Sequence, residues 1–366
     1  MSEFDLRRIR TRPLEERRSL LQVEDILIDP DASPPPLDPN TSAAVAAAAG
    51  RIGVARQRGA SVILMYGAHL LRNGAARIVS ELMERGWVTH LATNGAGSIH
   101  DWEFAWLGRS CESVEENVAD GTFGAWEETG RNLHLALLAG SLRGEGYGAA
   151  LGRFIHEDGA RLPSAEELRQ RLTTADPLAP ACAELLVTMQ THGLAVGVHR
   201  VEHRWKEASI LANAFRLGMP ATIHPGIGYD IVACHPMFNG AVLGRAAQAD
   251  FASFCASVDG LDGGVVLSVG SAIMAPQVFE KSLSCVHNVR FQEGREPVSG
   301  HAIFVVDLQD GGGWDWNQGE PPKTNPAYYL RFCKSFSRMG APLRYVQADN
   351  AAFIHALLHA LRASEA

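Results

Sequence analysis

The sequence predicts an α/β protein with a doubly wound, mostly parallel Rossmann-like sheet and a helical insertion. Short apolar runs bounded by glycine alternate with helical stretches, which is typical of a parallel sheet covered by helices on both faces. Two of these runs end in glycine-containing loops that lead directly into helix-like segments. Hydrophobic residues make up 46% of the 366 residues and charged residues 20%, so a large buried core is expected.

The elements follow a regular order from residue 41 onward. A proline-rich stretch predicts that residues 1–40 form an extended N-terminal arm, and residues 41–366 are expected to form a single domain. An alanine-rich helix is expected at about 42–57 and a second helix at about 69–85, with a kink at Asn73-Gly74. Strands are expected near 61–67, 87–93, 194–199, 220–224, 264–269, 301–308 and 343–348, with a helical insertion at about 100–192.

Composition excludes several function classes. The net charge of −8 argues against binding to a nucleic acid backbone. The first residues lack the apolar core of a signal peptide, and no apolar run is long enough to span a membrane, so a cytoplasmic protein is expected. The six cysteines are scattered without a CxxC pair, which favours reduced thiols and no metal.

The two glycine loops, at 87–101 and 265–274, indicate a nucleotide cofactor. A strand that turns on glycine into a helix brings backbone N–H groups and the positive helix end close to a phosphate. Neither loop matches the strict GxGxxG pattern, and such turns also join strands to helices where no ligand binds. Ligands of a doubly wound sheet lie outside the carboxyl ends of its strands, so the loops after the expected strands are the candidate site.

Polar side chains in these loops suggest a site for an amine. His100, Asp101 and Glu103 close the first glycine loop, and the 224–230 loop adds His224 and Asp230. Carboxylates hold ammonium groups by charge-assisted hydrogen bonds, and an aromatic ring can cover a cationic chain. Alternatively, Asp101 and Glu103 favour a helix N-terminus and Asp230 caps a turn. The long loop at 311–326 supplies tryptophans for such a cover, with Trp314 the candidate.

A competing motif is HRVEH at 199–203, which fits the HxxEH pattern of zinc hydrolases. In that pattern His199 and His203 would bind zinc and Glu202 would activate water. The chemistry requires the motif to lie within a helix. Here it follows a strand-like run directly, so a zinc hydrolase is the less favoured alternative.

Five segments of the chain resemble the deoxyhypusine synthase family, in particular its bacterial and archaeal deoxyhypusine-synthase-like members. The matching pieces span about 60 to 360. They are MYGAHLLRNG at 65–74, ATNGAGSIHD at 92–101, GIGYD at 226–230, VGSAI at 269–273 and LRYVQAD at 343–349.

This resemblance implies a Rossmann-like fold that binds NAD, in a homotetramer with active sites at subunit interfaces. It also implies oxidation of a polyamine and transfer of its aminobutyl group through an imine on an enzyme lysine. Only four of the 33 basic residues are lysines, and by segment order Lys334 lies nearest the family's nucleophile, with Lys323 in reserve. The pair of family glutamates is replaced by Ile99 and His100, and a substrate aspartate by Pro225, which argues against strict deoxyhypusine synthase activity.

The sequence therefore favours an NAD-dependent transferase or oxidoreductase that acts on a polyamine or a related cationic amine and forms a homo-oligomer. His100 would move the proton that leaves the amine, and Asp101, Glu103, His224, Asp230 and Trp314 would face the substrate. The alternative is a non-catalytic binding or regulatory protein with an NAD-type fold. The residues expected to face NAD are Gly67, Asn73, Thr93, Asn94, Gly95, Gly270, Ser271, Asp307 and Asp349.

Overall fold

The computed structural model describes residues 4–174 and 176–365, and its contacts divide the chain into two compact units. Unit 1 consists of Met1–Ile26, Ser98–Gly218 and Pro225–Asp250. Unit 2 consists of Leu27–Gly97, Met219–His224 and Phe251–Ala366. The expected insertion at 100–192 thus lies in unit 1, which also contains the first part of the expected N-terminal arm.

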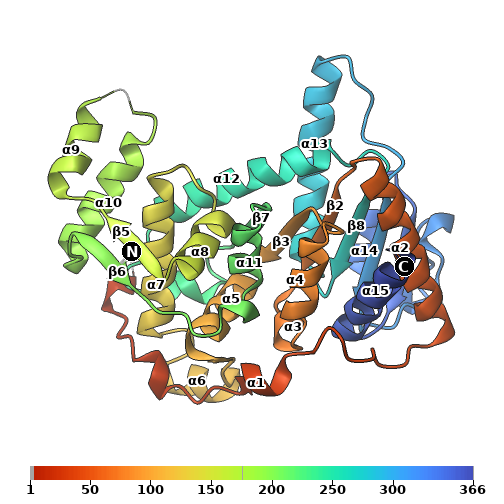
Figure 1. Ribbon diagram of the computed structural model, residues 1–366, viewed down its shortest axis with the longest axis horizontal. Coiled ribbons are helices and arrows are strands. Elements are labelled where there is room, and N and C mark those ends of the chain that lie inside the picture. The colour runs from red at the N-terminus through yellow and green to blue at the C-terminus, as the bar shows by residue number, and fades with distance from the viewer. Residues whose placement is uncertain (1–3, 175, 366) are drawn as a thin grey trace. The chain divides into compact units, whose positions relative to one another are not determined.

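Unit 2 contains a six-stranded, entirely parallel sheet (Figure 1). The strands are ordered β10-β9-β8-β2-β3-β7, so the first strand of the sheet in the sequence lies at its centre and the chain winds outward from it in both directions. This is the Rossmann strand order, and it confirms the doubly wound α/β class. The strands are β2 (Val62–Tyr66), β3 (His90–Asn94), β7 (Ala221–His224), β8 (Val265–Val269), β9 (Ala302–Asp307) and β10 (Leu343–Gln347).

Apart from Ser268 of β8, the two central strands β2 and β8 are apolar, because helices cover both faces of the sheet. All five residues of β2 and all five of β8 are buried, and the two strands pair in register from Val62 with Val265 to Tyr66 with Val269. Burial on both faces explains why these strands read as continuous apolar runs rather than as alternating patterns.

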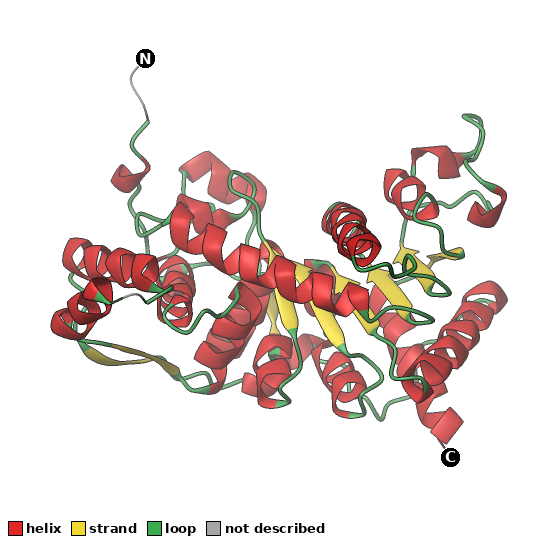
Figure 2. Cartoon of the chain, turned by 90° about the horizontal axis from the view of Figure 1, so that it is seen from above, coloured by secondary structure: helices red, strands yellow, loops and turns green. Residues whose placement is uncertain are grey.

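Helices pack on the two faces of this sheet (Figure 2). One group contains α2 (Pro39–Gln57), α3 (Ala68–Arg72), α4 (Ala76–Glu84) and α15 (Asn350–Glu365). The other contains α13 (Met274–Gln292), α14 (Arg331–Ser337) and the last residues of α12 (Gly240–Asp259). Phe254 of α12, Phe279 of α13 and Phe336 of α14 are fully buried in the core that this second group forms with the sheet.

Unit 1 is mainly helical, with α7 (Glu127–Ser141) at its centre, since every residue of α7 from Asn132 to Ser141 is buried. Two short antiparallel pairs, β1 (Leu21–Gln22) with β4 (Arg109–Ser110) and β5 (Gly159–Leu162) with β6 (Gly197–Arg200), complete it. The remaining α-helices are α1 (Val23–Ile26), α5 (Gly95–Leu107), α6 (Val114–Asp120), α8 (Tyr147–His156), α9 (Ala165–Thr173), α10 (Ala179–His192) and α11 (Ile210–Arg216).

Two expected elements differ in the structure. The helix expected at 69–85 is divided into α3 and α4 at Asn73-Gly74, where Gly74 adopts a φ of 79°, so the expected kink is a complete break. The strand expected at 194–199 is β6, which pairs with β5 in a hairpin of unit 1 and is not part of the parallel sheet. Among the described helices, none is sufficiently long and apolar to cross a membrane.

Candidate functional site

The carboxyl edge of the unit 2 sheet brings together most of the expected cofactor residues. Gly67 follows β2, Gly270 follows β8, and Asp307 ends β9. The backbone N–H of Gly67 donates to the carbonyl of Val269 at 3.1 Å, and that of Gly270 donates to the carbonyl of Val306 at 2.9 Å. These bonds hold three neighbouring strand ends in one row at the edge where doubly wound sheets bind ligands.

The glycines mark the point where the strand order reverses, between β2 and β8. A Cβ atom on Gly67 would lie 2.0 Å from the carbonyl oxygen of Gly270, closer than any real Cβ contact. Gly67 itself has an ordinary φ of −94°, so this close backbone approach, rather than conformation, requires a glycine there. Gly270 has a φ of 60°, which also favours glycine. Two glycines, which carry no side chain, therefore form the protein surface at the point where the strand order reverses.

Side chains and backbone are also closely packed at the end of the next strand, β3. The Thr93 hydroxyl donates to the carbonyl of Tyr66 at 3.0 Å, and the Asn94 side-chain oxygen accepts from the N–H of Gly97 at 2.9 Å. A Cβ on Gly97 would lie 2.1 Å from the Thr93 hydroxyl. Gly95 is the first residue of α5. Thr93 and Asn94 thus shape the turn into α5 and hold β3 against β2.

Three further expected residues have local backbone partners. Asp349 accepts from the N–H of Ala352 at 2.8 Å at the start of α15, and Asp307 accepts from the N–H of Gln309 at 3.1 Å. Ser271 accepts from the N–H of Ala275 at 3.3 Å. Asn73 lies at the far end of α3, away from the row of strand ends.

Asn350, which the sequence did not single out, lies against Gly270. Its side-chain nitrogen is 2.3 Å from the position of a Cβ on Gly270, and only 5% of the residue is exposed. Its side-chain oxygen is buried and has no hydrogen-bond partner in the described chain. A buried amide acceptor beside the switch point is suited to a ligand hydroxyl or amide. Only its position directly after Asp349 could have indicated it.

A hydrogen-bonded row of side chains leads to the carboxyl end of β7. His224, the last residue of β7, lies 3.1 Å from the Thr222 hydroxyl through its Nε2, and the Nε2 of His90 lies 3.0 Å from the same hydroxyl. The Nδ1 of His90 lies 2.7 Å from the Ser257 hydroxyl. The sequence predicted His224 as a substrate residue, whereas Thr222 and His90 lie inside the expected strands and gave no signal.

Acidification is expected to destabilise the protein through this row. Burial and the neighbouring His224 lower the pKa of His90 from 6.5 to about 3, and burial lowers the pKa of His224 from 6.5 to about 4. The unfolded chain therefore binds more protons, so stability is complete above about pH 6.5 and falls toward about pH 4 by about 1 kcal/mol per pH unit for each histidine.

Urea unfolding at a series of pH values measures this dependence. His90→Gln should flatten the pH dependence, because glutamine does not titrate. An unchanged slope in His90→Gln would contradict the assignment. Burial similarly lowers the pKa of three other histidines to about 4, so part of the slope should remain; they are His134, His203 and His301.

A cavity of about 650 Å³ lies at the carboxyl end of β10, lined by Gln347, Tyr345, Trp314 and Asp38 among others. The Trp314 ring nitrogen donates to the carbonyl of Gly319 at 2.9 Å, which fixes the ring. Trp316, in contrast, is buried in the core. Burial raises the pKa of Tyr345.

The carboxylates of Asp307 and Asp310 raise the pKa of Tyr345 further. Asp38 accepts hydrogen bonds from the backbone of Asn40 and Thr41, at 2.8 and 3.1 Å. Its carboxylate is therefore occupied at the start of α2. Arg344 also lines the cavity, and its guanidinium donates to backbone carbonyls at 3.2 Å, so the cavity combines aromatic rings with groups of both charges.

In unit 1, two of the expected substrate carboxylates have structural partners. Asp101 is fully buried and accepts from the Ser209 hydroxyl at 2.5 Å and the N–H of Ile210 at 2.7 Å, at the start of α11. Glu103 is fully buried and forms a bidentate ion pair with Arg17, with both contacts at 2.8 Å. Asp101 thus stabilises the start of α11, as in the alternative of a helix N-terminus, whereas Glu103 lies within α5 and forms a buried ion pair that the sequence did not predict.

The other expected unit 1 residues are His100 and Asp230. The His100 Nδ1 lies 2.7 Å from the Ser110 hydroxyl, beside the Glu103 network. Asp230 accepts from the N–H of Gly226 at 2.7 Å across the turn that it was expected to cap. Burial raises the pKa of Asp230 to about 6, so it titrates near neutral pH.

The lysines of unit 2 lie outside the row of strand ends. The Lys334 ammonium pairs with Glu320 at 2.7 Å and lies 3.3 Å from the centre of the Tyr328 ring. Both are contacts of a charged ammonium, whereas a nucleophile must be a neutral amine. Lys323 is exposed in the loop before α14.

The zinc alternative lacks the helix that it requires. His199 lies on strand β6 with its Nε2 2.7 Å from the carbonyl of Ala195, and the His203 side chain is buried against Phe154 and Trp102. Because the two imidazoles are not on consecutive turns of one helix, the HxxEH geometry is absent. In the described part of the chain, no three His, Cys, Asp or Glu side chains converge on a common metal position.

The chain is similar to several solved structures. No protein-family model and no curated protein matches it. AgrE, in a ternary complex with ornithine and NAD+, gives a TM-score of 0.45 and 13% identity over 90% of this chain and 34% of that chain. ArgZ, an arginine dihydrolase from the ornithine–ammonia cycle in cyanobacteria, gives 0.40 and 15% over 88% and 33%. A LOR/SDH-like protein from Methanococcus maripaludis S2 gives 0.45 and 12% over 93% and 74%.

These neighbours correct the resemblance drawn from the sequence. They are AgrE, ArgZ and a LOR/SDH-like protein, not deoxyhypusine synthases, so the assignment to that family is wrong. Its short matching pieces coincide with strand ends and glycine turns, which recur in many nucleotide-binding sheets. The homotetramer, the aminobutyl transfer and the nucleophilic Lys334 were implied by that resemblance and lose their basis. The chain spans about one third of the length of AgrE and of ArgZ.

Proposed function

We propose that unit 2 binds NAD at the carboxyl edge of its sheet and that the protein is an NAD-dependent oxidoreductase acting on a small cationic amine or amino acid. The observation that carries this proposal is the backbone contact at the switch point, where a Cβ on Gly67 would lie 2.0 Å from the Gly270 carbonyl oxygen. In a sheet of Rossmann order, a dinucleotide crosses this point, and glycines let the backbone approach its pyrophosphate.

Other residues at the same edge support the same assignment. Ser271 and the buried acceptor of Asn350 lie next to Gly270, and Thr93 and Asn94 border Gly67 from the side of β3. These side chains would orient the dinucleotide through hydrogen bonds to its hydroxyl and phosphate groups. When bound, the nicotinamide would supply a hydride acceptor.

The substrate class follows from the cavity beside Tyr345 and Trp314. Its aromatic rings and the nearby carboxylates of Asp307 and Asp310 favour an ammonium group, and the guanidinium of Arg344, which also lines it, can bind a carboxylate. His224 ends β7, at the opposite end of the strand order from β10, so it lies outside this cavity.

Titration of the purified protein with NAD+ by calorimetry tests the proposal. We expect a dissociation constant in the micromolar range, about −8 kcal/mol. At saturating NAD+, basic amino acids such as ornithine and simple diamines should produce reduced nicotinamide, measured by its absorbance. Folded protein that does not bind NAD+ would refute the cofactor assignment. Binding without reduction by any amine would refute the substrate class and leave the binding-protein alternative.

A further inference from the structure

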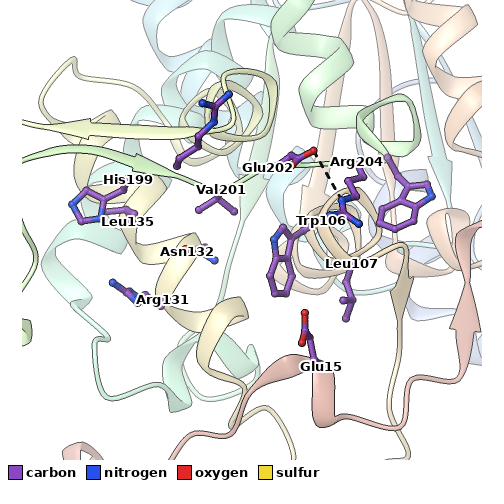
Figure 3. A pocket seen from close by; sticks show the side chains of 12 residues that line it. Glu15, Trp106, Leu107, Arg131, Asn132, Leu135, His199, Val201, Glu202 and Arg204 are labelled. Carbon is purple, nitrogen blue, oxygen red and sulfur yellow. Dashed lines mark ion pairs between the residues drawn. The ribbon is translucent and has the colours of Figure 1, made fainter.

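A second cavity, of about 600 Å³, lies entirely within unit 1 (Figure 3). Side chains from α5, α7, β6 and the segment after β6 line it. It shares no residue with the carboxyl edge of the sheet in unit 2, so the proposed NAD site does not account for it. Its composition differs from the rest of this acidic protein, because three arginines and two tryptophans meet there.

Two of the three arginines form no ion pair in the described part of the chain, although the carboxylate of Glu127 acts on Arg131 electrostatically. Arg204 lies 4.0 Å from Glu202, whereas Arg131 and Arg200 form no ion pair among the described residues. Glu127, one helical turn before Arg131, is already bonded to Thr11 at 2.6 Å. Unpaired guanidinium groups at a cavity of a protein with net charge −8 create a local positive potential that attracts anions.

The tryptophans present fixed planar faces. Trp106 stacks on the fully buried Trp102, with ring centres 5.1 Å apart and an angle of 20° between the planes. The backbone N–H of Trp205 donates to the carbonyl of Ala105 at 3.0 Å, and its ring packs against Gly108, where a Cβ would lie 2.7 Å from it. Rings that are already held in place lose little freedom when a planar ligand stacks on them.

A buried amide adds a directed polar contact. Asn132, on the helix that carries Arg131, is 7% exposed, and its side chain has no hydrogen-bond partner in the described chain. Figure 3 shows Arg131 and His199 on one side of the cavity and Trp106 and Glu15 on the other. The carboxylate of Glu15 would repel an anion beside it, so the anionic group belongs on the Arg131 side and the ring on the Trp106 side.

We propose that this cavity is a binding site for a small organic anion that carries a planar ring. Arg131 binds its phosphate or carboxylate group, Asn132 hydrogen-bonds to it, and the ring stacks on Trp106. Phosphate and carboxylate offer a guanidinium group the same bidentate pattern of acceptors. The experiment therefore has to show which of the two groups the ligand carries.

The test is calorimetric titration of the full chain with phenyl phosphate and, separately, with benzoate, in the presence of saturating NAD+. Tryptophan fluorescence serves as a second readout. At least one probe should bind, and binding should weaken with added salt. Arg131→Gln should raise the dissociation constant about tenfold, the usual loss for one charge-assisted hydrogen bond. Trp106→Leu should also weaken binding.

A matched control is Arg169→Gln, which removes an exposed arginine of unit 1 that does not line the cavity and should leave affinity unchanged. The probe that binds more tightly identifies the anionic group. The proposal is overturned if neither probe binds at millimolar concentration or if NAD+ displaces the probe. It is equally overturned if Arg131→Gln binds as tightly as Arg169→Gln.

Discussion

Replacing Gly67 with alanine is expected to abolish NAD binding and to lower the free energy of unfolding by about 3 kcal/mol. The added methyl would lie 2.0 Å from the carbonyl oxygen of Gly270, a backbone atom that a side-chain rotation cannot move away. The ends of β2 and β8 must then separate, and the floor of the proposed dinucleotide site is lost. Urea unfolding and NAD+ titration measure the two effects.

The matched control is Gly50→Ala, the same chemical change in the same unit. Gly50 lies in α2 with nothing within 4 Å of its Cβ position, so alanine should stabilise the helix by about 0.5–1 kcal/mol. NAD binding should be unaffected there. If Gly67→Ala behaved like Gly50→Ala, the close approach at the switch point would be refuted.

A milder variant separates loss of binding from loss of fold. In Gly270→Ala the new methyl meets the side-chain nitrogen of Asn350 at 2.3 Å, and that side chain can move. Its comparison is Gly340→Ala, where φ is also positive, at 76°, but the surrounding space is open. Both variants should lose about 1 kcal/mol to backbone strain. Only Gly270→Ala should weaken NAD binding. Equal NAD affinities of the two variants would show that this edge of the sheet is not part of the cofactor site.

Replacing Arg17 with leucine is expected to destabilise the protein by about 3–5 kcal/mol. Arg17 and Glu103 are almost fully buried, with side-chain exposures of 2% and 1%. Burial alone would raise the pKa of Glu103, but the Arg17 guanidinium and the surrounding hydrogen bonds hold it below its ordinary value. Without Arg17, a carboxylate remains buried with the Ser110 and Thr129 hydroxyls as hydrogen-bond partners and His100 nearby.

Thermal and urea unfolding measure this loss. The neighbouring Arg18 provides the control, since it pairs with Glu116 at 3.6 Å in an exposed contact and Arg18→Leu should change stability by less than about 0.5 kcal/mol. A double replacement of Arg17 and Glu103 by leucine should be less damaging than Arg17→Leu alone, because no unpaired charge stays buried. Equal effects at positions 17 and 18 would contradict the structural role of the pair.

Local patterns in the chain were sufficient to predict the strands that build the sheet. Continuous apolar runs at 62–66 and 265–269 indicated central strands, and the glycines after them indicated the turns, since both signals depend on neighbouring residues only. The strand at 197–200 shows the limit of this reasoning. Its own sequence resembles the sheet strands, yet it pairs with 159–162 in unit 1, and a pairing partner is not encoded locally.

The sequence by itself determined the fold class, the positions of the glycine loops and the list of polar residues near the strand ends. Only the tertiary structure decided which of those polar groups remain available to a ligand. Asp101 is occupied by Ser209, 108 residues away, and Glu103 by Arg17, 86 residues away. Asn350 and His90 acquire their roles through contacts with Gly270 and Thr222. A buried polar group must find a partner, and its partner is chosen by proximity in space, which spacing along the chain does not reveal.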